Sequence, residues 1–310
     1  MREMKTQPLV SILIISFNQE QFVGEALAGA LEQDYENLEV VIADDGSTDG
    51  TTEVILKFAE KYPDRLVPLT GGPNLGITGN SNRALRACKG KYIAFQGGDD
   101  VMLPGKVKSQ VEWLEVDEKR VLCGHGVEVV RPDGYVEILK TESKNCTGRG
   151  YLDFIKAGTS IFKTVSIMVR ASEIPLYGFD ERVPFVSDWK LWVDCLGKEG
   201  LYGCVDGIFA TYRLHNNNIT TTRSIDCIQD GIQIMQMLVA ENNDKHAERI
   251  LIRNIASRYL FLALSQVREK KMILGVKSAF KGFSLDPHNF SVSLLRIFYN
   301  KIERLFRKNG

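Results

Sequence analysis

Two adjacent carboxylates that follow two glycines are the residues of this sequence best suited to hold a metal ion. The segment Gly97-Gly98-Asp99-Asp100 comes just after the apolar run 91–95. Neighbouring carboxylates repel each other by ~1 kcal/mol in water, and a divalent cation turns that repulsion into attraction. Mg²⁺ and Mn²⁺ take one or two protein carboxylates and complete their shell with other oxygens, while the glycines leave room for a ligand against the backbone. The segment predicts a divalent-cation site; the alternative is a solvated turn.

A second polar segment, DDGSTD, begins at Asp44 directly after the apolar run 38–43. A carboxylate at the tip of a strand can accept the ring N–H of a uracil. Phe17, which follows the apolar run 9–16, can stack on the same base. We therefore expect nucleoside binding at Asp44 and Phe17; the alternative is an ordinary loop that caps the next helix.

A third carboxylate, Asp188, lies in the segment SDWKLW. At helical spacing Asp188 shares one face with Leu191, Trp192 and Cys195, so we expect it to face inward. The dipole at a helix N-terminus favours an ionised carboxylate, which is what a general base needs near neutral pH. Asp188 is therefore a candidate catalytic base, and the alternative is a helix-capping role.

Arg213 and His215 follow a strand-like run, and the alternation of a strand places both on one side. A guanidinium can hold a diphosphate, and a neutral imidazole nitrogen can complete a metal shell. We expect both side chains to reach the crevice, with His215 as a metal ligand. The alternative for His215 is a structural hydrogen bond.

The elements that position these residues alternate between strands and helices. Three apolar runs rich in Val and Ile are typical of strands covered on both faces: 9–16, 38–43 and 91–95. Apolar residues at three- and four-residue spacing predict three helices: 20–33, 50–61 and 78–88. The alternation predicts an α/β domain with a mainly parallel sheet, in which ligands bind at the carboxyl ends of the strands.

The pattern changes in the second half of the chain. A helical stretch after residue 104 leads to a predicted hairpin of strands 121–130 and 135–139. Residues 186–198 are expected to be helical, and 201–214 are expected to form two short strands around Asp206-Gly207. From about residue 224 the pattern is wholly helical, so we predict a catalytic domain over 1–222 and a helical region over 223–310.

The composition excludes several classes of protein. Hydrophobic residues make up 44% and charged residues 25%, which is typical of a folded globular chain. Lys and Arg together equal Asp and Glu at 39 each, so no global positive field favours nucleic acid, and no nucleic-acid partner is expected. The six cysteines form no CxxC pair, and the first apolar run is too short for a signal peptide or a membrane span. These features favour a cytoplasmic location.

Taken together, the motifs resemble those of the family 2 glycosyltransferases, which have the GT-A fold and invert the sugar's configuration. The resemblance covers about residues 8–222 and is carried by VSILIISFNQ, VVIADDGSTDGT, NLGITGNSNRAL, GKYIAFQGGDDVMLP, SDWKLW and YRLHNNNIT. It implies a GT-A (Rossmann-like) α/β fold with a mixed, mainly parallel sheet flanked by helices. It also implies transfer of a sugar from a nucleotide-sugar donor, with a UDP-sugar favoured, to a glycan or lipid-linked glycan in cell-surface polysaccharide or O-antigen assembly.

The resemblance assigns roles by matching motifs. It implies that the donor is bound by one set of residues: Ser16, Phe17, Asn18, Asp44, Asn74, Gly76, Gly97, Gly98, Asp99, Asp100 and Arg213. It implies that Asp99 ligates Mn²⁺ or Mg²⁺, and that Asp188 is the base that deprotonates an acceptor hydroxyl for in-line attack on the anomeric carbon. Three positions depart from the family: Ser187 stands where the family often has an acidic residue, Gly97 replaces the first Asp of an Asp-x-Asp motif, and Ser81 replaces a frequent Arg.

The departures at Gly97 and Ser81 leave a second hypothesis, a catalytically silent scaffold that only binds sugar nucleotides. A sugar nucleotidyltransferase ranks next, but residues 9–24 lack the Gly-rich phosphate loop it would need. A dinucleotide-dependent oxidoreductase is disfavoured because no GxGxxG follows the first strand.

The C-terminal helices carry no catalytic motif but show an amphipathic pattern. Apolar side chains recur at helical spacing: Phe290, Leu294, Ile297, Phe298, Ile302, Leu305 and Phe306. Packing on the catalytic domain or a homodimer interface explains such a stripe most simply. The functional alternative is peripheral contact of 290–308 with the inner face of a membrane, since residues 296–308 carry five basic side chains and one acidic.

Overall fold

The three Val- and Ile-rich runs form neighbouring parallel strands in the computed structural model, which describes residues 7–142, 146–158, 162–295 and 297. Strand β1 (Val10–Ser16) lies between β2 (Leu38–Asp44) and β4 (Tyr92–Gly97), and Ile12 is in register with Val40 on one side and Ala94 on the other. After β1 the chain thus forms β2 on one side of this strand and later forms β4 on its other side. This reversal creates a crevice at the carboxyl end of β1.

In the described ranges the strands form one mixed sheet in the order β3-β2-β1-β4-β9-β6-β10-β5, with β7 on β6 and β8 on β10. The remaining strands are β3 (Leu66–Leu69), β5 (Val101–Met102), β6 (Arg120–Val130), β7 (Val136–Leu139), β8 (Gly148–Arg149), β9 (Met168–Arg170) and β10 (Leu201–Arg213). The longest ladders, β1 with β2 and β4 and β10 with β6, are parallel, whereas β9 runs antiparallel to both its neighbours. The prediction of a mixed, mainly parallel sheet flanked by helices is confirmed.

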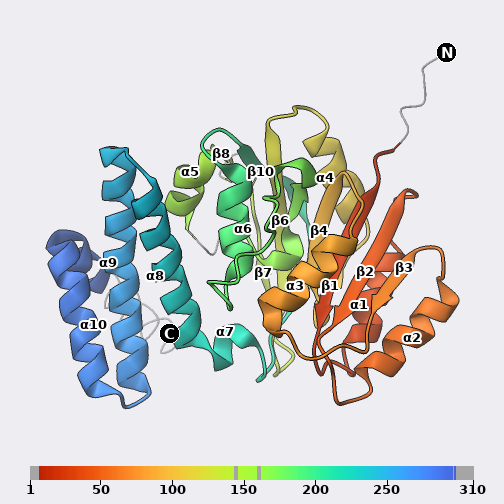
Figure 1. Cartoon of the computed structure of the whole chain (residues 1–310), viewed down its shortest axis with the longest axis horizontal. Coiled ribbons are helices and arrows are strands. Elements are labelled where there is room, and N and C mark those ends of the chain that lie inside the picture. Colours follow the sequence, from red (N-terminus) through yellow and green to blue (C-terminus); the bar gives the residue numbers. More distant parts are fainter. Residues whose placement is uncertain (1–6, 143–145, 159–161, 296, 298–310) are drawn as a thin grey trace, which may run out of the picture. The chain divides into compact units, whose positions relative to one another are not determined.

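Helices cover both faces of this sheet (Figure 1). They are α1 (Val23–Leu31), α2 (Thr51–Lys61), α3 (Gly76–Ala87), α4 (Lys106–Leu114), α5 (Gly150–Ala157) and α6 (Ser187–Leu196), with short 3-10 turns η2 (Thr164–Ser166) and η3 (Ala171–Glu173). Leu27 of α1 and Val111 of α4 pack with Ile12 and Val40 on one face. On the other face, where Figure 1 shows α3 and α6, Trp192 packs edge-on against Phe95 of β4 with ring centroids 4.6 Å apart.

The prediction of two short strands over 201–214 is wrong, because β10 is one strand of 13 residues. Its ladder with β6 is irregular between Cys204 and Ile208, and Gly207 has a φ of 141°. A bulge therefore absorbs Asp206-Gly207, where the sequence suggested a turn. The hairpin of β6 and β7 around residues 132–134 is as predicted.

The chain divides into two compact units, Met1–Asn216 and Asn217–Gly310. The second contains α7 (Ile219–Thr222), α8 (Ser224–Glu241), α9 (Lys245–Arg268), α10 (Met272–Leu285) and a helical segment over 287–295. Buried side chains of α8 and α9, such as Met235, Leu251 and Tyr259, form its interior. None of the helices within the described residues is long and apolar enough to cross a membrane.

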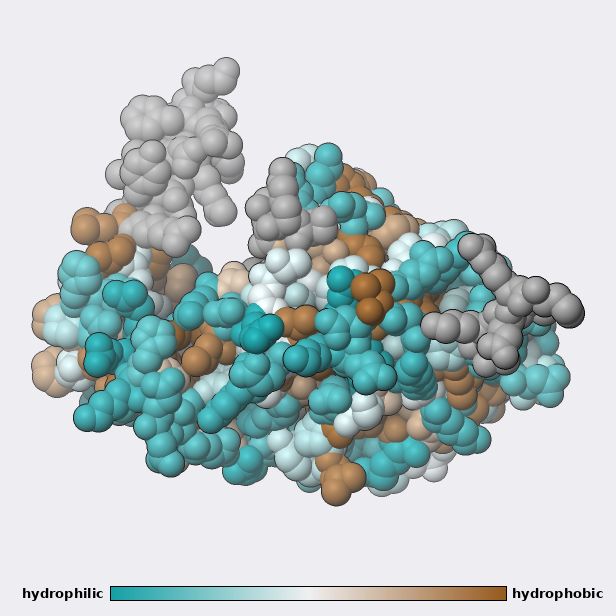
Figure 2. Space-filling model, turned by 90° about the horizontal axis from the view of Figure 1, so that it is seen from above, coloured by the Kyte–Doolittle hydropathy of each residue, from teal (hydrophilic) through white to brown (hydrophobic). Residues whose placement is uncertain are grey.

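The amphipathic stripe predicted over 290–306 lies only in part within the described residues. Phe290 is buried and packs edge-on against Phe283 of α10, so this member of the stripe serves internal packing. Phe298, Ile302, Leu305 and Phe306 lie outside the described residues. In the space-filling view of Figure 2, apolar and polar side chains are interspersed over the face that is drawn.

Candidate functional site

The carboxyl ends of β1 and β4 approach each other closely because Gly98 has no side chain. The Gly98 amide donates a hydrogen bond to the Ile15 carbonyl at 2.9 Å. A Cβ at Gly98 would lie 2.4 Å from Gln19 Oε1 and 3.1 Å from Ser16 Cβ. Glycine here lets the segment after β4 pack against the end of β1.

Asp99 and His215 meet at this end of the sheet, although they come from distant parts of the chain. His215 Nε2 lies 2.8 Å from Asp99 Oδ2, and both side chains are mostly buried. The structure thus brings together the two residues that the sequence suggested as metal ligands.

Asp100 is fully packed beside them and fixes the end of β10. Its Oδ1 accepts a hydrogen bond from the Arg213 amide at 3.0 Å. Burial, reinforced by the charge of Asp99, raises the pKa of Asp100 well above its ordinary value. Burial and the neighbouring carboxylate thus both disfavour the ionised form of Asp100.

Phe22 and Glu25 belong to this cluster, and the sequence analysis missed both. The Phe22 ring stacks on His215 with centroids 5.1 Å apart and planes 17° apart, and the Arg213 guanidinium lies 5.1 Å from the same ring. Arg213 Nη2 donates to Glu25 Oε2 at 2.6 Å. Phe22 and Glu25 are three residues apart at the start of α1, a spacing that puts them on one face; nothing local links that face to β10.

The prediction of a divalent-cation site can be tested against the side chains that meet here. Asp99 and His215 supply oxygen and nitrogen ligands of the kind that Mn²⁺ accepts. A Cβ at Gly97 would fill the space 2.5 Å from Asp99 Oδ1 and 3.6 Å from Asp100 Oδ2, so glycine leaves the side of both carboxylates open. Across the part of the chain that the structure describes, no group of three His, Cys, Asp or Glu side chains could hold a metal ion by itself. The donors fit a cation that takes its other ligands from a diphosphate and water.

Asp44 ends β2 in a buried position and accepts several hydrogen bonds from its own loop. Donors to its carboxylate are Ser16 Oγ at 3.2 Å, Ser47 Oγ at 2.5 Å and Thr52 Oγ1 at 2.7 Å. Its side chain therefore organises the ends of β1 and β2. That Asp44 also contacts the nucleobase of the donor stays a prediction.

The other predicted nucleoside residues surround this loop. Phe17 is 47% exposed, so its ring face is available at the surface. Asn18 has a φ of 52°, and its Oδ1 accepts a hydrogen bond from the Thr48 amide at 2.8 Å. Asn74 Oδ1 accepts from the Gly76 amide at 3.1 Å at the start of α3. These residues border the same loop region as Asp44.

Arg83 is a further basic side chain near this loop. Its Nη1 donates to the Asp44 carbonyl at 3.4 Å, and its charge opposes the burial that raises the pKa of Asp45. Ser81, where a family Arg is frequent, is buried in α3. Arg83 thus supplies positive charge two residues after the position where the motif lacks it.

Asp188 lies in the first turn of α6, where Thr164 holds it. Its Oδ2 accepts from Thr164 Oγ1 at 2.5 Å, and its Oδ1 accepts from the Trp189 amide at 2.7 Å. Burial raises the pKa of Asp188, and these hydrogen bonds only oppose the rise. The Trp189 amide at the helix N-terminus does favour the ionised form, but desolvation, which the sequence analysis did not weigh, has the larger effect.

Lys163 and Thr164 connect Asp188 with the acidic pair. Lys163 precedes Thr164 in the chain, and its charge acts on Asp100, where it opposes the rise of that pKa. Thr164 donates to Asp188. Thr164 thus contacts the predicted catalytic base, and its neighbour Lys163 acts on the predicted metal site.

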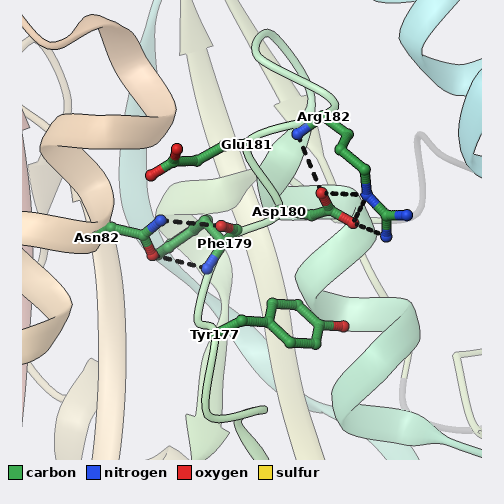
Figure 3. Close-up of a pocket in the computed structure, with 6 residues that line it drawn as sticks. All are labelled: Asn82, Tyr177, Phe179, Asp180, Glu181 and Arg182. Carbon is green, nitrogen blue, oxygen red and sulfur yellow. Dashed lines mark hydrogen bonds and ion pairs between the residues drawn. The ribbon is translucent and has the colours of Figure 1, made fainter.

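The segment that leads into α6 is fastened to α3 at two points. Asn82 makes a pair of hydrogen bonds with the backbone of Phe179, at 2.9 and 2.8 Å (Figure 3). Thr78 Oγ1 lies 3.0 Å from the Pro184 carbonyl and 2.8 Å from Ser187 Oγ. This fastening fixes the start of α6 and with it Asp188.

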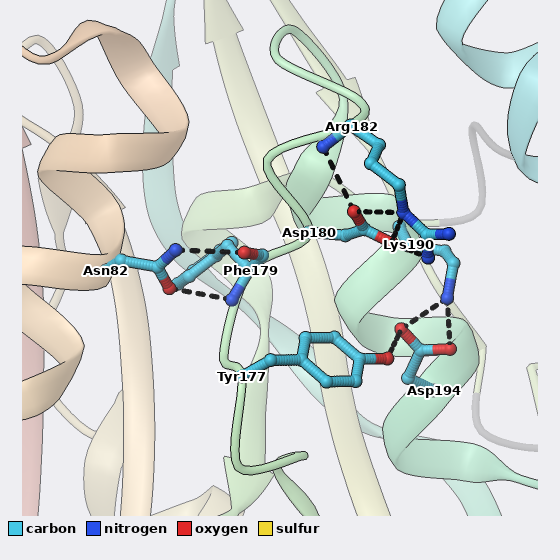
Figure 4. A network of polar contacts seen from close by, with 7 residues as sticks. All are labelled: Asn82, Tyr177, Phe179, Asp180, Arg182, Lys190 and Asp194. Atoms are coloured by element: carbon cyan, nitrogen blue, oxygen red, sulfur yellow. Dashed lines mark hydrogen bonds and ion pairs between the residues drawn. The ribbon is translucent and has the colours of Figure 1, made fainter.

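A shallow cavity of about 390 Å³ opens between these elements, lined by Asn82, Tyr177, Phe179, Asp180, Glu181 and Arg182 (Figure 3). Beside it, Tyr177 donates to Asp194 Oδ2 at 2.8 Å, and Asp194 also pairs with the buried Lys190 (Figure 4). Arg182 pairs with Asp180 at 2.6 Å. Of the charged groups that line the cavity, Asp180 and Arg182 therefore pair with each other.

Comparison with known proteins bears on the fold and the family. The model of glycosyl transferase family 2 matches residues 11–165, which is half of the chain. An uncharacterized protein of Mycobacterium tuberculosis is 39% identical over 127 residues, and the match spans 40% of this chain and 37% of that protein's length. An uncharacterized glycosyltransferase of Haemophilus influenzae is 25% identical over 231 residues, covering 70% of this chain and 69% of the relative. A Bacillus subtilis protein with the name "Putative glycosyltransferase EpsE" is 33% identical over 126 residues, covering 41% of this chain and 45% of the relative.

Solved structures share the fold. Residues 1–349 of S. aureus TarS in complex with UDP-GlcNAc superpose with a TM-score of 0.67 at 16% identity, covering 92% of this chain and 83% of that TarS fragment. A mannosyltransferase from Pyrobaculum calidifontis in complex with GDP-Man and Mn²⁺ gives a TM-score of 0.63 at 18% identity, covering 97% and 81%.

Proposed function

The chain belongs to glycosyl transferase family 2, and from that membership we propose that it transfers a sugar, with inversion, from a nucleoside diphosphate donor to an acceptor hydroxyl. One observation carries the proposal: the pairing of Asp99 with His215 at the end of β4. A carboxylate and an imidazole that can bind a divalent cation, beside an arginine at a strand terminus, suit the anionic diphosphate of such a sugar nucleotide.

The donor site comprises the loops after β1, β2 and β4. Asp44 and Phe17 lie in the loops where a nucleoside would bind, and Arg213 stands beside Asp100 where a diphosphate would follow. The solved complexes of similar fold contain UDP-GlcNAc and GDP-Man, which supports a sugar nucleotide as the donor class. We favour uridine on the family resemblance at Asp44, whose carboxylate can accept the ring N–H of a uracil.

Asp99 and His215 would hold a divalent cation, Mn²⁺ or Mg²⁺. When bound, such a cation supplies positive charge that stabilises the departing diphosphate. Arg213 adds a fixed positive charge on the same side, and its guanidinium is held by Glu25 and Phe22 in the free protein.

Asp188 would act as the general base. Its ionised carboxylate would take the proton of the acceptor hydroxyl as that oxygen attacks the anomeric carbon from the side opposite the diphosphate. Thr164 and the Trp189 amide hold the two carboxylate oxygens in place. A single displacement of this kind inverts the configuration of the sugar.

The acceptor we propose is a glycan or lipid-linked glycan in the assembly of a cell-surface polysaccharide. The enzyme would then work in the cytoplasm, at the inner face of the membrane. The basic residues of 296–308 support this placement at the level of the sequence.

A second candidate, a silent scaffold that binds sugar nucleotides, is favoured by Gly97 and Ser81. These positions lack a carboxylate and a guanidinium that are frequent in the family motifs. The scaffold would bind a nucleotide and release no nucleoside diphosphate from its sugar.

The test is a thermal shift series followed by a turnover assay. The pure protein is melted with UDP, GDP or dTDP, each with and without Mn²⁺, since a ligand of the native state raises Tm. A Mn²⁺-dependent rise with one nucleotide, followed by release of that nucleotide from its sugars, supports the transferase. A rise without release supports the scaffold, and no rise with any nucleotide contradicts both.

A further inference from the structure

Helix α10 exposes a row of large apolar side chains. Met272, Ile273, Val276 and Phe280, here called the α10 stripe, have exposed fractions of 57%, 74%, 65% and 73%. Their spacing along the helix places them on one face within about a third of its circumference. Exposed apolar groups gathered in this way mark an interaction surface.

Helix α10 packs tightly against α9 through another side, and this packing fixes its rotation. The exposure of the stripe therefore follows from the packing of the helix. A Cβ at Gly282 would lie 2.9 Å from the Ala256 carbonyl oxygen, and one at Gly275 would lie 3.1 Å from the Ala263 carbonyl oxygen. The two glycines let α10 approach α9 closely. The stripe faces away from this contact.

The helix that carries the stripe has only basic charged residues, although Glu269, which pairs with Lys271 at 2.7 Å, and Asp286 flank it. Residues 270–285 contain four lysines and no acidic residue. Lys277 and Lys281 are exposed and border the stripe, with Lys281 Nζ 4.9 Å from the centroid of the Tyr259 ring of α9, whereas Lys270 and Lys271 precede the helix. An apolar face with a lysine border is typical of a helix that lies in the interface of an anionic membrane.

We propose that α10 docks on the surface of a membrane that contains anionic lipid. The stripe would enter the boundary between headgroups and acyl chains, and the lysines would contact lipid phosphates. A second copy of the chain fits less well, because a two-fold contact through this face would bring lysines of both copies together. This site is distinct from the 290–308 segment, whose Phe290 is buried, and it does not depend on the transfer reaction.

The experiment measures sedimentation of the full chain with vesicles. Vesicles of phosphatidylcholine alone are compared with vesicles that also contain phosphatidylglycerol. We expect binding to the mixed vesicles, weakened by salt, and little binding to the neutral ones. Replacing Ile273 and Phe280, the two most exposed members of the stripe, with Ser should lower the partition coefficient by about tenfold or more.

Two further variants separate charge from apolar contact. Lys277→Gln with Lys281→Gln should reduce binding by about fivefold for each lysine and only on anionic vesicles. Leu176→Ser, a matched change at a fully exposed leucine of the first unit, should have no effect. Unchanged binding of the stripe variant, or no binding of the wild type to anionic vesicles, overturns the proposal. A wild-type dimer that the stripe variant loses, seen by analytical ultracentrifugation without vesicle binding, identifies a second copy as the occupant instead.

Discussion

His215 Nε2 lies 2.8 Å from Asp99 Oδ2, although 116 positions separate the two residues in the chain. The strand order makes this meeting possible, since β4 and β10 end at the same edge of one sheet. The Arg213 amide bonded to Asp100 aligns the segment that carries His215. The pair is therefore a product of topology and supplies two ligands of different chemistry at one point.

Removing either member of this pair should abolish the effect of Mn²⁺ on stability. Asp99→Ala and His215→Ala should each lose the Mn²⁺-dependent part of the Tm increase seen with UDP, because the cation binds only the native state. The control is Asp64→Ala, an exposed acidic residue after α2. A full Mn²⁺ effect in both site variants would exclude this pair as the metal ligands.

The Phe22 ring should act as a positioning residue for the same site. Phe22→Leu removes the surface on which His215 and Arg213 rest, and we expect Mn²⁺ affinity in the presence of UDP to fall about tenfold, as is usual when support of a ligand is lost. Phe22→Tyr keeps the ring and should restore affinity. Titration calorimetry measures the change.

The His215 resonance gives a second readout that needs no metal. Stacking on Phe22 should displace the ring-proton signal of His215, and Phe22→Leu should return it toward its ordinary position. Phe58→Leu, the same change at a ring stacked on Tyr62 in α2, should alter neither readout. An unmoved His215 signal in Phe22→Leu would show that the ring does not hold the imidazole.

Asp188 should set the acidic limb of the pH–rate profile. A base works only when ionised, so the raised pKa of Asp188 moves the loss of kcat/KM at low pH to a higher pH than a solvated aspartate would give. Thr164→Val removes a hydrogen bond that favours the carboxylate, so the limb should move higher still, whereas Thr164→Ser should leave it in place. Asp188→Asn should lower kcat by roughly 10²–10⁴-fold with little change in donor binding. An acidic limb that Thr164→Val leaves unchanged would argue against Asp188 as the base.

The parts of this molecule that follow from local patterns could be predicted from the sequence. The runs that became β1, β2 and β4 are continuous and apolar, and polar groups after such strands meet at one edge because parallel strands end together. The sequence named Asp99 and His215 as candidate metal ligands of one crevice, but their contact depends on where β10 ends.

What failed depends on contacts between distant elements. The sequence around Asp206-Gly207 allows a turn as readily as a bulge, and pairing with β6 decides in favour of the bulge. The role of Phe22 depends on where β10 ends relative to α1. The pKa of Asp188 depends on how deeply α6 is packed, which a dipole argument from the sequence does not include.

Lys106, buried between α4 and the sheet, should make the stability of the first unit depend on pH. Burial lowers its pKa from 10.5 to about 7, and its Nζ donates to Gln110 Oε1 at 2.8 Å. Between about pH 7 and 10.5 the unfolded chain therefore holds a proton at Lys106 that the folded chain has lost. Because stability rises with pH wherever the unfolded state binds more protons, Lys106 destabilises the fold most below pH 7, and this cost declines above it.

Lys106→Met should remove that dependence. Two other titratable groups face the lysine from β6: His125, whose pKa burial lowers to about 3, and Cys123, whose pKa burial raises. His125 therefore changes stability below pH 6.5, and Cys123 does so only above about pH 9, so the interval from 7 to 9 reports on Lys106. The free energy of unfolding of wild type minus Lys106→Met, measured by urea denaturation, should rise across this interval by up to ~1.4 kcal/mol per pH unit. The loss of a partner for Gln110 shifts the variant by the same amount at each pH, so it leaves the slope unchanged. A flat difference would mean that Lys106 stays charged in the folded protein.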